Sequence, residues 1–128
     1  MKCVVEISTD FPSGIKPGCG RAEIRIWTEI DGTRHESGPF LIEEDNITKQ
    51  RLEILAVNWA LNRFKKTGQE ITIRMSGTYV NPNLQYLDRW HEQEFRRAGK
   101  RILANEDQWR KLWMHMHLQK ITIENAAV

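Results

Sequence analysis

Two acidic residues stand at positions from which they could bind a cation. Asp10 ends an alternating apolar stretch and precedes a Gly/Pro-rich loop, and Glu53 borders the apolar stripe of an amphipathic segment. Carboxylate oxygens are the ligands that Mg²⁺ prefers in proteins. A carboxylate beside an apolar stripe is also compatible with a surface group whose stem packs on the core. Asp10 and Glu53 alone are therefore compatible with two interpretations, a buried polar site and an ordinary protein surface.

A third polar residue stands at the end of another apolar stretch. The segment ITIRMSGTYV (71–80) is typical of a buried strand that runs into a turn, with Ser76 beside Gly77 at its end. A small polar residue in this position is often placed in a site. Whether Ser76 belongs to a working site or to a disabled one decides much of the functional interpretation.

The elements that position these residues follow from the hydrophobic period. Alternation predicts strands over 3–10, 21–28 and 33–42, joined in part by a turn at Asp31-Gly32. An i, i+3, i+4 stripe predicts a helix over 48–66, which Asn46 or Thr48 can cap. Further along we expect a strand over 70–76, a short helix from Asn81-Pro82, helices over 84–98 and 106–117, and a strand over 120–125. The predicted fold is a single α/β domain over residues 1–128, with a five-stranded mixed sheet that contains a three-stranded antiparallel meander and has helices on its faces.

Bulk composition excludes several classes of protein. No apolar run approaches the ~20 residues of a membrane span, and the N-terminus enters a strand pattern at once. We therefore expect no membrane association, no signal peptide and a cytoplasmic location. Cys3 and Cys19 are expected to be free thiols because the predicted hairpin holds them apart. A net charge of +2 is too small to predict nucleic-acid binding by itself.

Basic residues gather in one segment, RWHEQEFRRAGKRILANEDQWRKLW (89–113). Basic side chains beside aromatic rings suit phosphate contact and stacking. The alternative is a solvated helix end, where cations are favoured by the helix dipole, with the tryptophans in the core. The candidate nucleic-acid contacts in this segment are Trp90, Arg96, Arg97, Lys100 and Arg101.

Four fragments in register resemble type 1 ribonuclease H. They are VEISTD (5–10), PSGIKPGCG (12–20), TKQRLEILAVNWAL (48–61) and ITIRMSGTYV (71–80). The similarity runs in order from Val4 to about Asn125. The resemblance implies a ribonuclease H-like fold and hydrolysis of the RNA strand of an RNA–DNA hybrid, with two Mg²⁺ ions held by four carboxylates.

The resemblance also assigns roles, and it is incomplete. It places Asp10 and Glu53 at the first two carboxylate positions, and Thr48 and Gln50 at contacts with the nucleic-acid backbone. Ser76 stands at the third carboxylate position, where a neutral hydroxyl supplies no charge. The fourth carboxylate belongs to a helix beyond the last strand, and this sequence stops at ENAAV, so the C-terminal helix is missing.

The predicted function is therefore a ribonuclease H-like nucleic-acid-binding domain that is catalytically inactive and recognises RNA–DNA hybrid or structured RNA. Asp10 and Glu53 are expected to hold Mg²⁺ or Mn²⁺ weakly, if at all. One alternative is a metal-dependent ribonuclease H with a reduced or subunit-shared metal site, and another is a protein-interaction scaffold without nucleic acid. Loss of the last helix is expected to leave apolar surface on the sheet, which predicts a homodimer.

Overall fold

A five-stranded mixed sheet forms the base of the molecule in the computed structural model, which describes residues 2–14, 16–96 and 102–125. The strand order is β3-β2-β1-β4-β5. Strands β1 to β3 form an antiparallel meander, and β4 and β5 run parallel to β1 and to each other. The strands are β1 (Lys2–Asp10), β2 (Gly18–Ile30), β3 (Thr33–Ile47), β4 (Glu70–Met75) and β5 (Lys120–Asn125). The predicted mixed sheet with its meander is confirmed.

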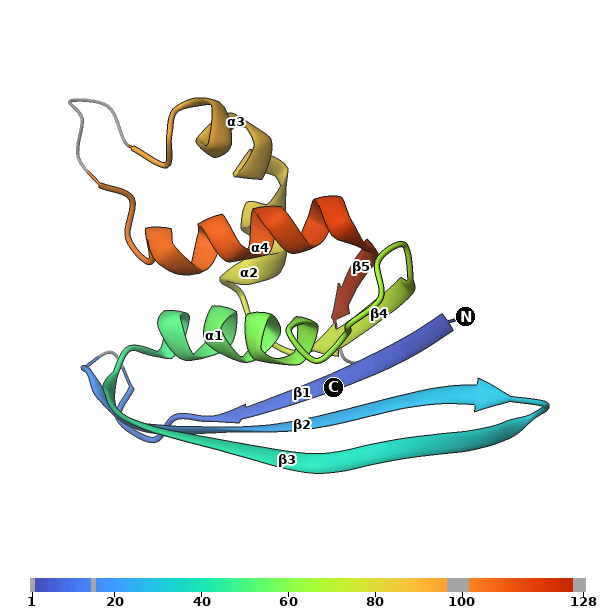
Figure 1. Cartoon of the computed structure of the whole chain (residues 1–128). Helices are drawn as coiled ribbons and strands as arrows, with labels where there is room; N and C mark the ends of the chain where they lie inside the picture. The colour runs from blue at the N-terminus through green and yellow to red at the C-terminus, as the bar shows by residue number, and fades with distance from the viewer. Residues whose placement is uncertain (1, 15, 97–101, 126–128) are drawn as a thin grey trace.

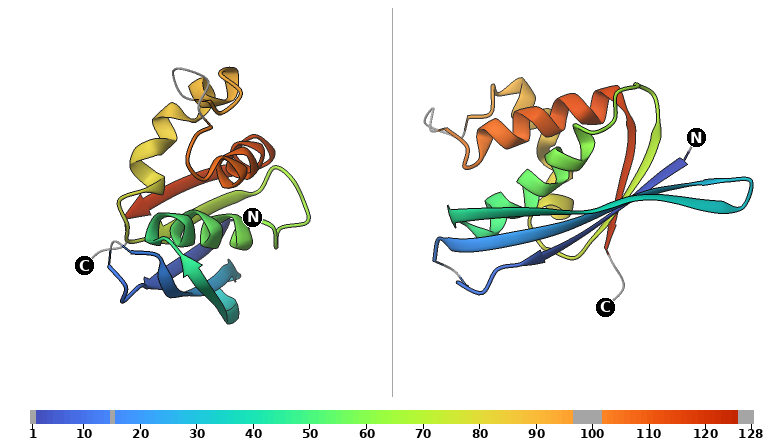
Figure 2. Two further views of the ribbon diagram at one scale, coloured as in Figure 1. Left: turned by 90° about the vertical axis from the view of Figure 1, so that its left-hand side faces the viewer. Right: turned by 60° about the horizontal axis from the view of Figure 1, so that its bottom comes forward.

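The helices lie together on one side of this sheet (Figure 1). They are α1 (Lys49–Leu61), α2 (Val80–Asn83), the 3₁₀ turn η1 (Leu84–Tyr86), α3 (Leu87–Glu92) and α4 (Glu106–Leu118). Alternate residues of β1, namely Cys3, Val5 and Ile7, are buried beneath them. The far end of the β2–β3 hairpin extends past the helices (Figure 2). None of the helices within the described ranges has the length and apolar character needed to cross a membrane.

Two predicted helices are shorter than their sequence patterns indicate. The first ends at Leu61 and not at Lys66. The predicted helix over 84–98 is wrong in its second half, because α3 ends at Glu92. Glu94 and Phe95 adopt left-handed backbone conformations, with φ of 54° and 57°, which a helix does not tolerate. This reversal places the Phe95 ring in the core at 1% exposure. Strand β3, in contrast, runs beyond the predicted end at residue 42.

An ion pair joins the starts of the two long helices. The Arg51 guanidinium donates to both carboxylate oxygens of Asp107, over 2.9 Å and 2.7 Å. This bidentate contact holds the pKa of Asp107 below its usual value and raises that of Arg51. Deeper in the same interface, the Asn58 amide donates to the backbone and side-chain oxygens of Gln108. Helices α1 and α4 are therefore tied by polar contacts as well as by packing.

The sheet face opposite the helices carries charged side chains that pair with one another. Arg34 lies 3.9 Å from Glu6, and Arg74 lies 3.0 Å from Glu124. The Trp27 ring is only 8% exposed, and the Arg34 guanidinium sits 3.7 Å from its centroid. Among the described residues, this face is therefore largely charged, although Leu41 is 59% exposed on it. The homodimer stays a prediction.

Candidate functional site

Parallel pairing brings two of the predicted site residues to one end of the sheet. Asp10 is the last residue of β1, and Ser76 directly follows β4. Ile7 lies opposite Met75 in the parallel register of these strands, so both chains leave the sheet at the same edge. Asp10 and Ser76 are exposed there. This is the edge at which ligands commonly bind in sheets that contain parallel strands.

Glu53 reaches the same region from α1, but its carboxylate is buried at 3% exposure. Its Oε1 accepts hydrogen bonds from the backbone N–H groups of Tyr79 and Val80, over 3.1 Å and 3.3 Å. The turn that follows Ser76 therefore folds onto the carboxylate, which satisfies the free N–H groups at the start of α2.

Gly77 makes this close approach possible. Its φ of +149° is rarely adopted by residues with a side chain, and a Cβ placed on it would lie 2.4 Å from Glu53 Oε1. Sequence reasoning did not find this role. The signal available was a glycine directly after a strand that ends near a carboxylate.

Tyr79 connects this turn to α4. Its hydroxyl accepts hydrogen bonds from Trp109 Nε1, over 2.9 Å, and from the Asn105 side-chain amide, over 3.1 Å. Trp109 is fully buried, and its ring meets the edge of the half-buried Trp90 ring with a centroid separation of 5.0 Å. These two tryptophans belong to the packing between α3 and α4. Trp90 nevertheless keeps part of its ring surface accessible.

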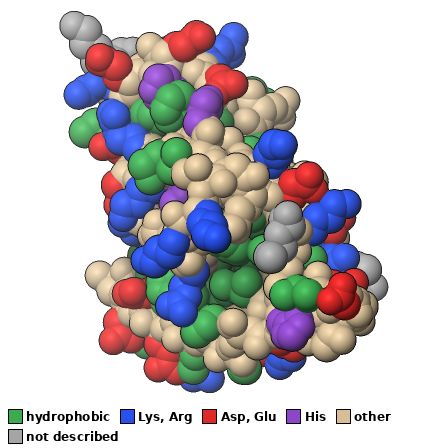
Figure 3. Space-filling model, turned by 45° about the vertical axis from the view of Figure 1, so that its right-hand side comes forward, with side chains coloured by type: hydrophobic (Ala, Val, Ile, Leu, Met, Phe, Trp, Pro, Cys, Tyr) green, Lys and Arg blue, Asp and Glu red, His purple; other side chains and the backbone are tan. Residues whose placement is uncertain are grey.

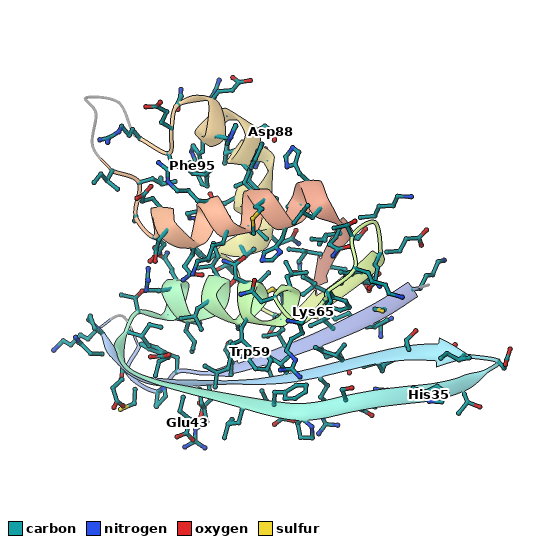
Figure 4. The ribbon with its side chains drawn as sticks, in the orientation of Figure 1. His35, Glu43, Trp59, Lys65, Asp88 and Phe95 are labelled. Atoms are coloured by element: carbon teal, nitrogen blue, oxygen red, sulfur yellow. The ribbon has the colours of Figure 1, made fainter. Side chains whose placement is uncertain are left out.

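The predicted nucleic-acid contacts are only partly within the described residues. Arg96 pairs with Ile102 in a short antiparallel bridge, whereas Arg97, Lys100 and Arg101 lie outside the described residues. The segments that carry Asp88 and Phe95 stand well away from the sheet (Figure 4).

The other two predicted contacts lie at the start of α1. Thr48 caps this helix as predicted, because its hydroxyl accepts a hydrogen bond from Arg51 N over 3.1 Å. Gln50 is exposed in the first turn.

A small acidic pocket of about 240 Å³ lies beside Asp10. Cys19 lines it and donates a hydrogen bond to Asp45 Oδ1 over 3.1 Å, which raises the pKa of the thiol. Both cysteines are free, as predicted. Within the parts of the chain that the structure describes, no three His, Cys, Asp or Glu side chains lie close enough to hold a metal ion together.

Sequence comparison relates the chain to ribonucleases H. No protein-family model matches it. It is 30% identical over 119 residues to the ribonuclease H of Nitrosospira multiformis, a match that covers 92% of this chain and 73% of that protein. It is 29% identical over 85 residues to the ribonuclease H of Syntrophomonas wolfei, covering 65% of this chain and 58% of the relative's own length.

Structural comparison agrees on the fold. LC9-RNase H1, described as a type 1 RNase H with the type 2 active-site motif, superposes with a TM-score of 0.77 at 13% identity, over 98% of this chain and 62% of that one. The foamy viral protease-reverse transcriptase in complex with RNA/DNA hybrid superposes with a TM-score of 0.73 at 19% identity, over 96% of this chain and 17% of that one. Together with the sequence match over most of both proteins, these findings show that the chain belongs to the ribonuclease H family.

Proposed function

We propose that the chain is a nucleic-acid-binding domain that recognises RNA–DNA hybrid, or an RNA helix of similar shape, without hydrolysing it. One observation carries this proposal. At the edge of the sheet where the family resemblance implies a metal centre, Glu53 is buried against backbone N–H groups, and the residue that follows β4 there is the neutral Ser76.

The residues present do not fit a pair of divalent cations. Two such ions about 4 Å apart repel each other strongly, and several anionic oxygens must hold them. Asp10 is exposed and can serve as a ligand. One oxygen of Glu53 already accepts two hydrogen bonds, and Ser76 contributes no charge. The proposed function therefore includes no hydrolytic step.

Binding is supported by the family and by a basic segment of the sequence. A structural neighbour is described in complex with RNA/DNA hybrid. A ligand that crosses the edge of the sheet would meet Thr48 and Gln50 at the start of α1, and the segment 96–101 supplies four cations in the sequence. Asp10 and Glu53 repel a phosphate chain, so we expect Mg²⁺ to improve binding even without catalysis.

The first prediction is that the purified chain binds hybrid but releases no RNA fragments in Mg²⁺ or Mn²⁺. Each cation that neutralises a phosphate displaces condensed counterions. Arg96→Ala together with Arg97→Ala should therefore weaken hybrid binding and flatten its salt dependence by about two units. Fluorescence anisotropy with labelled hybrid over a salt series measures the binding, and gel analysis of the RNA strand measures the cleavage.

Two outcomes would replace this proposal with a different one. Cleavage that disappears in Asp10→Asn would establish the metal-dependent nuclease. Absence of binding to hybrid, RNA helix and single strands at low salt would leave the protein-interaction scaffold. Arg25→Ala with Arg74→Ala is the matched control, since it removes two positive charges from the opposite, ion-paired face.

A second prediction concerns Ser76, which supplies no negative charge at the third carboxylate position. Ser76→Asp should raise the affinity for Mn²⁺ roughly tenfold or more, because one added negative charge ~4 Å from a divalent cation is worth about 2 kcal/mol even in a water-like medium. Ser76→Asn has nearly the same size without the charge and serves as the control. Isothermal titration with Mn²⁺ measures both variants. Equal affinities for the two would mean that residue 76 does not face the cation.

A further inference from the structure

A second surface that combines aromatic rings and cations lies at the opposite end of α1 from Thr48. We call it the α1–β3 surface; it consists of Phe40, Trp59, Arg63, Phe64, Lys65 and Lys66. Phe40 of β3 and Trp59 of α1 pack with ring centroids 5.2 Å apart. The Arg63 guanidinium lies over both rings, 4.5 Å from the centroid of Phe40 and 5.3 Å from that of Trp59.

This surface lies between the C-terminal end of α1 and the sheet. In Figure 4, Trp59 projects from α1 towards β3, and Lys65 lies in the segment that follows the end of α1. The space-filling view of this side shows hydrophobic side chains in a hollow, with several lysine and arginine side chains gathered along its rim (Figure 3).

The cations of this surface differ from the arginines of the opposite sheet face in their ion pairing. Among the described residues, neither Arg63 nor Lys65 nor Lys66 takes part in an ion pair, and all three are exposed. The arginines on the opposite face of the sheet are instead matched by glutamates, as Arg25 is by Glu23. The helix dipole favours a cation at Arg63, directly after the C-cap Asn62, but it does not account for Lys65 and Lys66 further along the chain.

The aromatic rings beside these cations are only partly covered. Phe40, Trp59 and Phe64 are each half-buried, and the Arg63 guanidinium lies over the Phe40 and Trp59 rings. Rings and guanidinium planes next to unpaired cations form the combination that binds single-stranded nucleic acid, because bases stack on the planes while cations follow the phosphates. A duplex keeps its bases stacked internally and cannot use the rings.

We propose that the α1–β3 surface binds a single strand of RNA or DNA, separately from the hybrid-binding path proposed above. Helix α1 has 13 residues, which separates its two ends by about 20 Å at 1.5 Å per residue. We assign the Thr48 end of α1 to contacts with hybrid and the Arg63 end to contacts with a single strand. The second site does not depend on the first being correct.

The test compares labelled oligo(dT), oligo(rU) and RNA–DNA hybrid by fluorescence anisotropy over a salt series. Lys65→Ala with Lys66→Ala should weaken binding of both single strands and reduce the salt slope by about 1.4 units, as expected for two contacts with a single strand. Phe64→Leu keeps an apolar side chain without a ring, and it should weaken binding about fivefold with the salt slope unchanged. Arg25→Ala with Arg74→Ala removes the same charge as the lysine pair and should have a smaller effect.

Hybrid binding should be unaffected by the lysine pair and remain sensitive to Arg96→Ala with Arg97→Ala. Three results would overturn the single-strand site: no binding of single strands by the unaltered chain at low salt, equal losses from the lysine pair and its control, or equal losses for hybrid and single strand from the lysine pair. Single-strand binding without hybrid binding would support this site and contradict the function proposed above, so the two failures are distinguishable.

Discussion

Replacing Gly77 by alanine is expected to destabilise the fold by about 2.5–6 kcal/mol. A non-glycine residue held at a φ of +149° costs about 1–3 kcal/mol by itself. The new Cβ would also lie 2.4 Å from Glu53 Oε1, which forces the carboxylate away from the N–H groups of Tyr79 and Val80. Losing hydrogen bonds to a charged group adds about 1.5–3 kcal/mol before the structure relaxes. Urea unfolding followed by circular dichroism measures the free energy.

A double-mutant cycle separates the clash from the backbone strain. Glu53→Ala removes the atoms that the new methyl group meets, so Gly77→Ala should cost less in that background, with a coupling energy of at least about 1 kcal/mol. Gly32→Ala is the matched control, because Gly32 also has a positive φ, of +77°, but a Cβ placed on it would have no atom within 4 Å. Additive effects of Gly77→Ala and Glu53→Ala would show that the carboxylate does not hold the turn.

The order of elements could be predicted because it depends on local periodicity. The alternation in β1 matches its burial closely, since Cys3, Val5 and Ile7 all face the helices. The stripe in α1 likewise placed Glu53 at the border of the core. The sequence did not predict the hydrogen-bond partners of that carboxylate, because the N–H groups of Tyr79 and Val80 are 26 and 27 residues away in the chain. A charged residue near an apolar stripe does not reveal which distant turn folds onto it.

The predicted helix over 84–98 was wrong because tertiary packing overrides the local helical pattern. The local pattern there favours a continuous helix, but Phe95 is buried at 1% exposure and its N–H donates to Trp90 O over 2.6 Å. Burial of a ring is worth more than the remaining helical turns, since it removes a large apolar area from water. The charge on the open face of the sheet also depends on tertiary pairing. Its charged side chains pair across strands, a feature that depends on strand register.

Trp109→Ala is expected to cost about 3–5 kcal/mol of stability, the range for removing a large aromatic side chain from a core. Trp109 is fully buried, and its indole N–H donates to the Tyr79 hydroxyl. The ring therefore supports both the edge of Trp90 and the turn that carries Tyr79. Because native domains are stable by only about 5–15 kcal/mol, this single change should remove a large part of the free energy of unfolding.

Trp109→Phe separates packing from hydrogen bonding in the same position. It keeps most of the ring volume and loses the N–H donor, while the Tyr79 hydroxyl retains the Asn105 amide as a partner. We expect it to cost about 1–2 kcal/mol, because one of two hydrogen bonds to that hydroxyl remains. Thermal and urea unfolding measure both variants. If alanine cost no more than phenylalanine, the ring would not be the anchor that joins α4 to the turn. If phenylalanine cost as much as alanine, the hydrogen bond to Tyr79, and through that residue the position of the Glu53 carboxylate, would be the main contribution of Trp109.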